Sequence, residues 1–225
     1  MSNNLILCIQ GDSRPWRQAE FTAAAHRLSS LWGGANIVGF HRADHMMDAV
    51  AGMVCIKRLA IVSHGWPVGI GRRRARGIRT TIHKPPYIVD VDTFARVLGP
   101  RLAPESHVAL AACSTGASRW HWRWSWRSYG PAQRFPTFAD ELYWGLCQWS
   151  DVDIIAHSAA GHTTRNVGKR KWSRYLRGIS MMDVHFGPGA HEKRAQRREW
   201  VRLMKREDDA GYTNAERLMA GLPLA

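Results

Sequence analysis

The chain has 225 residues, of which 45% are hydrophobic and 22% are charged, so it is long enough to bury a substantial core. An excess of 32 Lys+Arg over 18 Asp+Glu gives a formal net charge of +14, which favours encounters with anionic partners such as nucleic acid. No stretch approaches the roughly 20 apolar residues of a membrane-spanning helix, which excludes that class of protein.

The four cysteines are scattered along the chain and form no Cys-x-x-Cys pair. This spacing indicates neither a disulfide framework nor a structural zinc site, and we expect no metal. Cys8, Cys55 and Cys147 lie among apolar residues and are expected to be buried. The first apolar run is too short for a signal peptide, so we expect a cytoplasmic protein with reduced thiols.

Apolar runs alternate with segments of helical periodicity along the chain. In chain order we expect a strand at 5–9, a helix at 16–32 started by Ser13 and Pro15, a strand at 36–40, a helix at 44–55 with Met46, Met47, Val50 and Val54 inward, a strand at 59–63, a helix at 91–98, a strand at 107–112, a helix at 137–149, a strand at 153–157, and helices at 191–209 and 214–220. This alternation predicts an α/β fold with a mostly parallel sheet sandwiched between helices. We assign residues 1–188 to the α/β domain and residues 189–225 to a basic helical C-terminal extension.

Two of the predicted strands end at reactive residues. His64-Gly65 follows the run at 59–63, and Cys113 follows the run at 107–112. Ligands of open α/β sheets bind at the carboxyl ends of the strands, so a thiol–imidazole dyad is expected there. His64 is the candidate base and Cys113 the candidate nucleophile, with the backbone N–H groups of Gly65 and Cys113 as oxyanion donors in a strand-to-loop turn.

The order strand-His-Gly, then strand-Ala-Cys about fifty residues later, resembles the caspase/gingipain-type cysteine peptidases. The helical segment Phe138-Ala139-Asp140-Glu141-Leu142 and the strand segment Asp153-Ile154-Ile155-Ala156-His157-Ser158 are similar to those that follow the nucleophile in that superfamily. The resemblance covers roughly residues 4–165. It implies a caspase-like fold and hydrolysis of peptide bonds in a protein or peptide substrate by the His64/Cys113 dyad, without a cofactor.

The resemblance also implies a substrate-binding role for Asp12, at the position that often sets P1 preference in the superfamily. A carboxylate there favours Arg or Lys at P1 through a charge-assisted pair. The alternative is that Asp12 is a helix N-cap or turn residue.

A second enzyme class stays open, an α/β-hydrolase-type esterase with a cysteine nucleophile. Its late acid and histidine would be Asp183 and His185. The glycines of a nucleophile elbow are absent, because Ala111 and Thr115 occupy their positions. A catalytically inactive member of the caspase-like fold is a further alternative.

Two long loops have an unusual amino-acid composition. The first contains a cluster of arginines within 72–79, and the second contains a stretch at 120–127 in which Trp and Arg alternate. With the C-terminal helix they suggest a non-enzymatic nucleic-acid-binding or assembly protein, because Trp and Arg stack on bases and pair with phosphate. The alternatives are a solvated loop and an aromatic flap that packs on the protein itself. His107 and His157 are expected to be structural, whereas His162 lies beyond a strand end and stays open.

Overall fold

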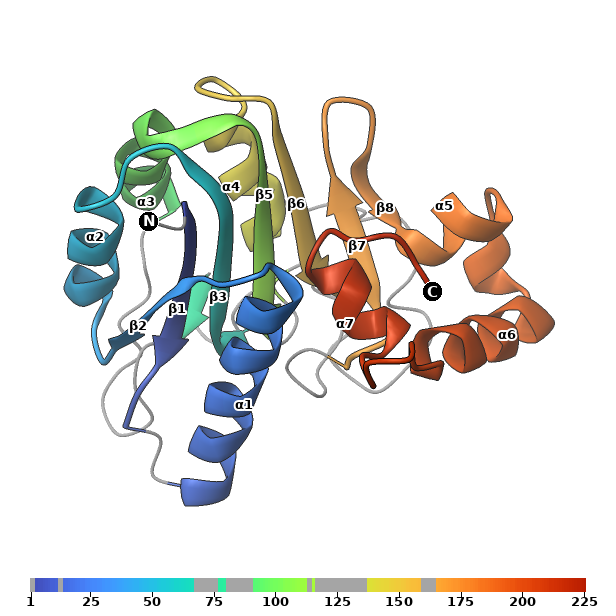
Figure 1. Ribbon diagram of the computed structural model, residues 1–225. Helices are drawn as coiled ribbons and strands as arrows, with labels where there is room; N and C mark the ends of the chain where they lie inside the picture. The colour runs from blue at the N-terminus through green and yellow to red at the C-terminus, as the bar shows by residue number, and fades with distance from the viewer. Residues whose placement is uncertain are drawn as a thin grey trace, which may run out of the picture.

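Within the described residues, eight strands form a mostly parallel sheet at the centre of the protein (Figure 1). The computed structural model describes residues 3–11, 14–66, 77–79, 91–112, 115, 137–158 and 165–225. Its strands are β1 (Asn4–Ile9), β2 (Asn36–Phe40), β3 (Ile56–Trp66), β4 (Gly77–Arg79), β5 (Leu102–Ala112), β6 (Val152–His157), β7 (Lys169–Trp172) and β8 (Arg177–Ser180). The order is β2-β1-β3-β5-β6-β7-β8, parallel from β2 to β6, with β7 and β8 antiparallel and β4 paired to β3 off this path. The predicted α/β class with a mostly parallel sheet is confirmed.

Helices cover both faces of this sheet. They are α1 (Pro15–Leu31), α2 (Ala43–Ala51), α3 (Val91–Leu98), α4 (Phe138–Leu146), α5 (Met181–Phe186), α6 (Arg194–Lys205) and α7 (Asn214–Met219), with short 3-10 turns η1 (Gly99–Arg101) and η3 (Ala190–Glu192). In Figure 1, α1 and α7 lie in front of the sheet, and α2, α3 and α4 lie behind it. Because helices cover both faces, the central strands are continuously apolar and fully buried, as in Leu59–Val62 of β3 and Val108–Ala112 of β5. None of the described helices has the length and apolar character to cross a lipid bilayer.

Helix α1 follows its sequence pattern closely. Pro15 occupies the first turn, and the buried residues Phe21, Ala24, Ala25 and Leu28 recur at helical spacing. The N-cap is Arg14, which makes no side-chain cap hydrogen bond, and Ser13 lies outside the described residues.

Several predicted boundaries differ from the structure. Strand β5 begins at Leu102 rather than at 107, helix α4 ends at Leu146 rather than at 149, and helix α6 spans Arg194–Lys205 rather than 191–209. Helix α2 ends at Ala51 with Gly52 as C-cap, so the predicted continuation to Cys55 is wrong, and Val54 is 80% exposed rather than inward. Strand β3 continues past Ser63 to Trp66, because β4 pairs with its last residues in antiparallel register. A short strand, β4, therefore lies inside the long loop that was predicted to carry the arginine cluster.

The antiparallel end of the sheet was not predicted from the sequence. Strand β7 (Lys169–Trp172) has the sequence KRKW, yet Lys169, Arg170 and Trp172 are almost completely buried. A run rich in cations carries no periodic apolar signal, so only tertiary packing identifies it as a strand.

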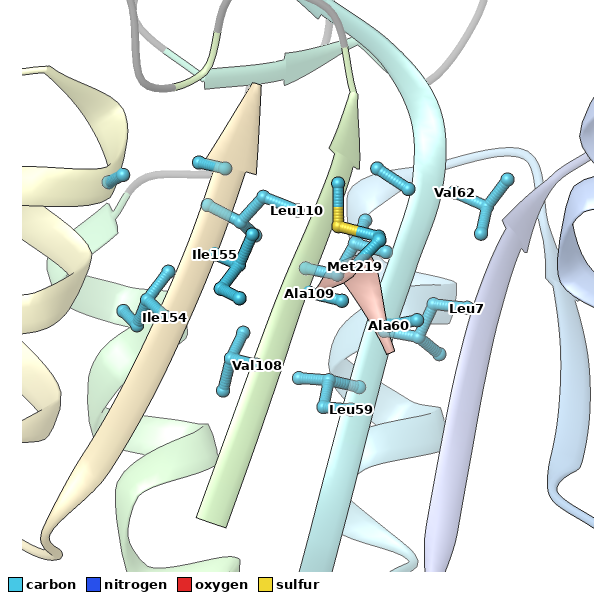
Figure 2. Packing of buried hydrophobic residues seen from close by; sticks show 14 of the residues in the cluster. Leu7, Leu59, Ala60, Val62, Val108, Ala109, Leu110, Ile154, Ile155 and Met219 are labelled. Atoms are coloured by element: carbon cyan, nitrogen blue, oxygen red, sulfur yellow. The ribbon is translucent and has the colours of Figure 1, made fainter. Parts of the chain in front are cut away.

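The C-terminal region packs into the same hydrophobic core as the sheet. Trp200 and Met204 of α6 and Met219 of α7 are buried members of the cluster that contains the strands. Figure 2 shows Met219 among side chains of β3 and β5. The Trp32 indole N–H also donates to the Ala220 carbonyl at 2.9 Å, which joins α1 to the end of α7. Residues 189–225 therefore contain η3, α6 and α7, and they share their packing with the α/β part.

A buried carboxylate fixes α7 against α1. Glu216 is 0% exposed, and Arg27 of α1 pairs with it through two nitrogens at 2.5 and 2.8 Å. The Thr213 backbone N–H and hydroxyl donate to the same carboxylate, and Arg165 lies 3.3 Å from it. Burial alone raises the pKa of Glu216, but the hydrogen bonds from Arg27 and Thr213 outweigh it and lower the pKa from 4.5 to about 2.

Candidate functional site

Three neighbouring parallel strands, β1, β3 and β5, end at one edge of the sheet. Their register pairs Cys8 with Val62 and Ser63 with Ala112. The strand order reverses between β1 and β3, because the chain passes from β1 outward to β2 and then returns across β1 to β3. Ligands of open α/β sheets bind outside the carboxyl ends of the strands at such a switch point. This edge is therefore the candidate site.

His64 lies within β3 at this edge, where its Cα is paired with that of Arg79 in β4. The imidazole is half-buried, and its ring meets the ring of Phe21 edge to face, with centroids 4.7 Å apart and planes at 89°. Phe21 is a buried residue of α1, so the helix fixes one side of the imidazole. The sequence alone did not predict this contact.

Gly65 also lies within β3, paired with Ile78 of β4. The strand-to-loop turn expected at Gly65 is therefore not formed there, because the strand continues through this residue. Cys113 and Asp12, the other two predicted site residues, lie outside the described residues, as do His162, the Arg cluster from 72 to 76 and the Trp/Arg stretch at 120–127.

The chain on both sides of positions 113 and 114 is anchored. Ala112 ends β5 and is fully buried, and Thr115 is 1% exposed. The Thr115 hydroxyl donates to the Ala112 carbonyl at 3.1 Å, and its own carbonyl accepts from the Ala139 N–H at 3.1 Å. Threonine side chains often form such local hydrogen bonds to nearby backbone carbonyls in turns. The threonine after Cys113 was therefore a signal in the sequence from which this turn could have been predicted.

Helix α4 begins beside this turn. Thr137 is its N-cap and forms a capping box with Asp140, as the two side chains bond to each other's backbone N–H groups. The second oxygen of Asp140 accepts from the Trp172 indole at 2.6 Å, which ties the start of α4 to β7. The carboxyl edge is therefore held by contacts from α1, α4 and β7.

Of the three described cysteines that were expected to be buried, two are exposed. Cys8 is buried, and this burial raises the pKa of its thiol to about 11. Cys55 and Cys147 are exposed, so their predicted burial is wrong. Both follow the last turn of a helix, where apolar neighbours in sequence do not ensure burial.

Histidines 107 and 157 lie in β5 and β6, and both have the surroundings of structural residues. His107 bonds to the Met219 carbonyl at 2.9 Å, and burial lowers the pKa of its imidazole. His157 is 0% exposed at the end of β6.

The acid and histidine of the hydrolase alternative do not pair with each other. The Asp183 carboxylate contacts Nδ1 of His191 at 2.7 Å and accepts from the His191 backbone N–H at 3.0 Å. His185 instead packs against the rings of Phe186 and Trp200, with centroids 4.6 and 5.9 Å away. The structure therefore gives that alternative no Asp–His pair from these residues.

Lys169 is a buried cation at the start of β7. Its ammonium donates to the Asn166 carbonyl and lies in the field of Glu216. Burial lowers the pKa of Lys169 from 10.5 to about 7. The folded state therefore binds fewer protons than the unfolded state between these two values.

We expect the free energy of unfolding to rise with pH from about 7 to 9 because of Lys169, and the raised pKa of the Cys8 thiol opposes this slope above pH 9. Lys169→Met removes this slope and stabilises the protein at neutral pH by roughly 1–3 kcal/mol, since an apolar group replaces a buried cation. Denaturant unfolding across this pH range measures both effects. Lys57→Met, at an exposed lysine, is the control, and an unchanged slope in Lys169→Met would contradict the assignment.

The fold and the site define a class of protein, an α/β protein with its candidate site at the carboxyl edge of a mostly parallel sheet. No protein family, no curated protein and no solved structure matches the chain. No group of three His, Cys, Asp or Glu side chains suited to a metal ion occurs within the described part of the chain.

Proposed function

We propose that the protein is a cysteine peptidase of the caspase-like type, with His64 as general base and Cys113 as nucleophile. The observation that carries the proposal is the register of β3 and β5, in which Ser63 is paired with Ala112. Each reactive residue directly follows one member of this pair in the sequence. Consecutive Cα atoms lie about 3.8 Å apart and neighbouring strands about 5 Å apart, so chain connectivity keeps the two residues at one edge of the sheet.

The proposed reaction is an acyl transfer through the cysteine sulfur. His64 accepts the thiol proton of Cys113, and the thiolate attacks the carbonyl carbon of the scissile peptide bond. Backbone N–H groups, with those of Gly65 and Cys113 as candidates, stabilise the oxyanion. The C–N bond then breaks as the imidazolium protonates the leaving amine. Water, deprotonated by His64, hydrolyses the thioester and restores the thiol.

Two described contacts support this assignment. The Phe21 ring restricts the orientation of the His64 imidazole, and a base must be oriented to accept a proton in one direction. Thr115 anchors the chain two residues after the proposed nucleophile to both β5 and α4. The order of the His-Gly and Ala-Cys segments, which resembles the caspase-like superfamily, therefore falls on two adjacent parallel strands.

Asp12 is the proposed P1-binding residue. In the sequence it follows Ile9, the last residue of β1, by three positions, and β1 pairs with β3 on the side away from β5. A carboxylate that contacts the P1 side chain favours a guanidinium or ammonium group there. The alternative role as a turn or cap residue predicts no dependence of activity on the P1 charge.

A panel of fluorogenic peptides with Arg, Lys or Asp at P1 tests this function. We expect turnover after Arg or Lys, and a drop of about 10- to 100-fold in kcat/KM for these peptides in Asp12→Asn, the value of one lost charge-assisted bond. An equal drop for every peptide would contradict the specificity role of Asp12. An absence of turnover with the whole panel, from folded wild-type protein, would contradict the peptidase assignment.

A further inference from the structure

Helix α6 carries a row of cations along one side. We define the basic stripe as Arg194, Arg198, Arg202 and Lys205. Their spacing of four, four and three residues places them on one face of the helix, and all four are exposed. Towards the other described residues, none of the four side chains makes a hydrogen bond or an ion pair.

The opposite face of α6 is fixed to the protein. Trp200 and Met204 are buried in the core, and the Trp200 indole donates to the Val167 carbonyl at 2.9 Å. Arg197 donates from one nitrogen to the carbonyls of His191 and Glu192 at 3.0 and 2.9 Å. In Figure 1 the helix lies at the periphery of the molecule. The helix that carries the basic stripe is therefore already folded and fixed to the protein core before any partner binds.

Helix stability accounts for only part of the basic stripe. Cations four residues apart repel each other on a helix surface. The helix dipole favours Arg202 and Lys205 in the last turn but disfavours Arg194 in the first turn. Glu199 is the single carboxylate in the sequence of the helix and lies beside the stripe. An external anion is the group that this charge pattern complements.

We propose that the basic stripe of α6 binds the phosphate backbone of duplex DNA without reading its sequence. The stripe runs from Arg194 to Lys205 over the 12 residues of α6, a rise of about 16 Å along the helix axis. Duplex DNA carries one charge per roughly 1.7 Å, so several phosphates lie within its reach. Three of the four cations are arginines, whose planar guanidinium groups fit phosphate oxygens.

The burial of the apolar face of α6 distinguishes DNA from a lipid surface. A helix that lies on a membrane inserts its apolar side chains between the lipids. The apolar residues Trp200 and Met204 of α6 are 1% and 0% exposed in the protein core, so they are not accessible to lipid. The exposed cations of the basic stripe are therefore the part of α6 that can contact a partner, and they complement a polyanion in water.

The test measures binding to a fluorescein-labelled duplex of random sequence, by anisotropy, from about 50 to about 200 mM salt. The variant Arg198→Gln/Arg202→Gln keeps the helix propensity and removes two cations of the stripe. Two lost phosphate contacts reduce the slope of log K against log[salt] by about 1.8 and weaken binding about 60-fold at about 0.1 M salt. The matched control Lys57→Gln/Arg177→Gln removes the same charge from exposed positions on β3 and β8 and leaves the slope unchanged.

The stripe variant is expected to unfold thermally at the wild-type temperature or above it, since it relieves repulsion within the helix. An equal loss of DNA affinity in the two double variants would show that binding depends on net charge alone, which would overturn the proposal. An unchanged slope in the stripe variant would do the same, as would binding to phosphatidylserine vesicles without binding to the duplex. Cys113→Ala is expected to bind the duplex like wild type, so this result is independent of the proposed peptidase activity.

Discussion

Cys113→Ala is expected to lower kcat/KM for peptide cleavage by at least about a thousandfold, and His64→Ala by a similar factor. The nucleophile and the base act as one unit, so the double variant should lose little more activity than either single variant. Steady-state assays with the best peptide of the P1 panel measure all three.

The control variant for this loss is Cys55→Ala/Cys147→Ala. Cys55 precedes β3 and Cys147 follows α4, so both lie at the amino edge of the sheet, opposite the candidate site. Their exposed thiols are expected to be dispensable, and the variant should keep wild-type kcat/KM. Full activity in Cys113→Ala would show that another group is the nucleophile.

Glu216→Gln is expected to destabilise the protein by about 3 kcal/mol at neutral pH. The amide cannot balance the charge of Arg27, and its NH₂ group replaces an oxygen that accepts from the Thr213 backbone N–H or from Arg27. Denaturant unfolding of both proteins gives the difference. Asp44→Asn is the matched control, because the Arg42–Asp44 pair is exposed at 63% and 52% and such pairs contribute only about 0–1 kcal/mol.

The same carboxylate predicts an acid dependence of stability. The pKa of Glu216 is lowered on folding, so its contribution is complete above pH 4.5 and is lost as the pH falls towards about 2. Glu216→Gln should show a flatter loss of stability over this window than wild type. If the free energy of unfolding falls equally in both proteins between pH 4.5 and about 2, the stabilising role of the Glu216 carboxylate would be contradicted.

The parallel part of the sheet is predictable from the sequence for a clear physical reason. Strands covered on both faces are continuously apolar, and the runs that end at Ser63 and Ala112 have that character. Strand β7 lacks it, because Lys169 and Arg170 are buried through contacts that no local pattern encodes. The exposed position of Cys55 was missed for the related reason that α2 ends four residues before it.

The sequence predicted which strand ends share an edge of the sheet, but not the contacts that His64 and Gly65 make there. The strand ends predict that His64 and the chain before Cys113 share one edge, and the Ser63–Ala112 pairing agrees with this. The pairing of Gly65 with β4 and the contact of Phe21 with His64 join segments far apart in sequence. Such contacts depend on how α1 and β4 dock, which apolar periodicity does not specify.

The most direct test of the dyad is the pH dependence of Cys113 alkylation by iodoacetamide, followed by mass spectrometry. The Cys55→Ala/Cys147→Ala background removes the two exposed thiols, and Cys8 is buried with its pKa raised to about 11. The dyad predicts rapid alkylation well below the pKa of about 8.5 of a free thiol, and a return to that ordinary profile in His64→Ala. If Cys113 is alkylated with the same pH profile, with its midpoint at about 8.5, whether or not His64 is present, the thiolate–imidazole pair on which the proposed peptidase activity rests would be contradicted.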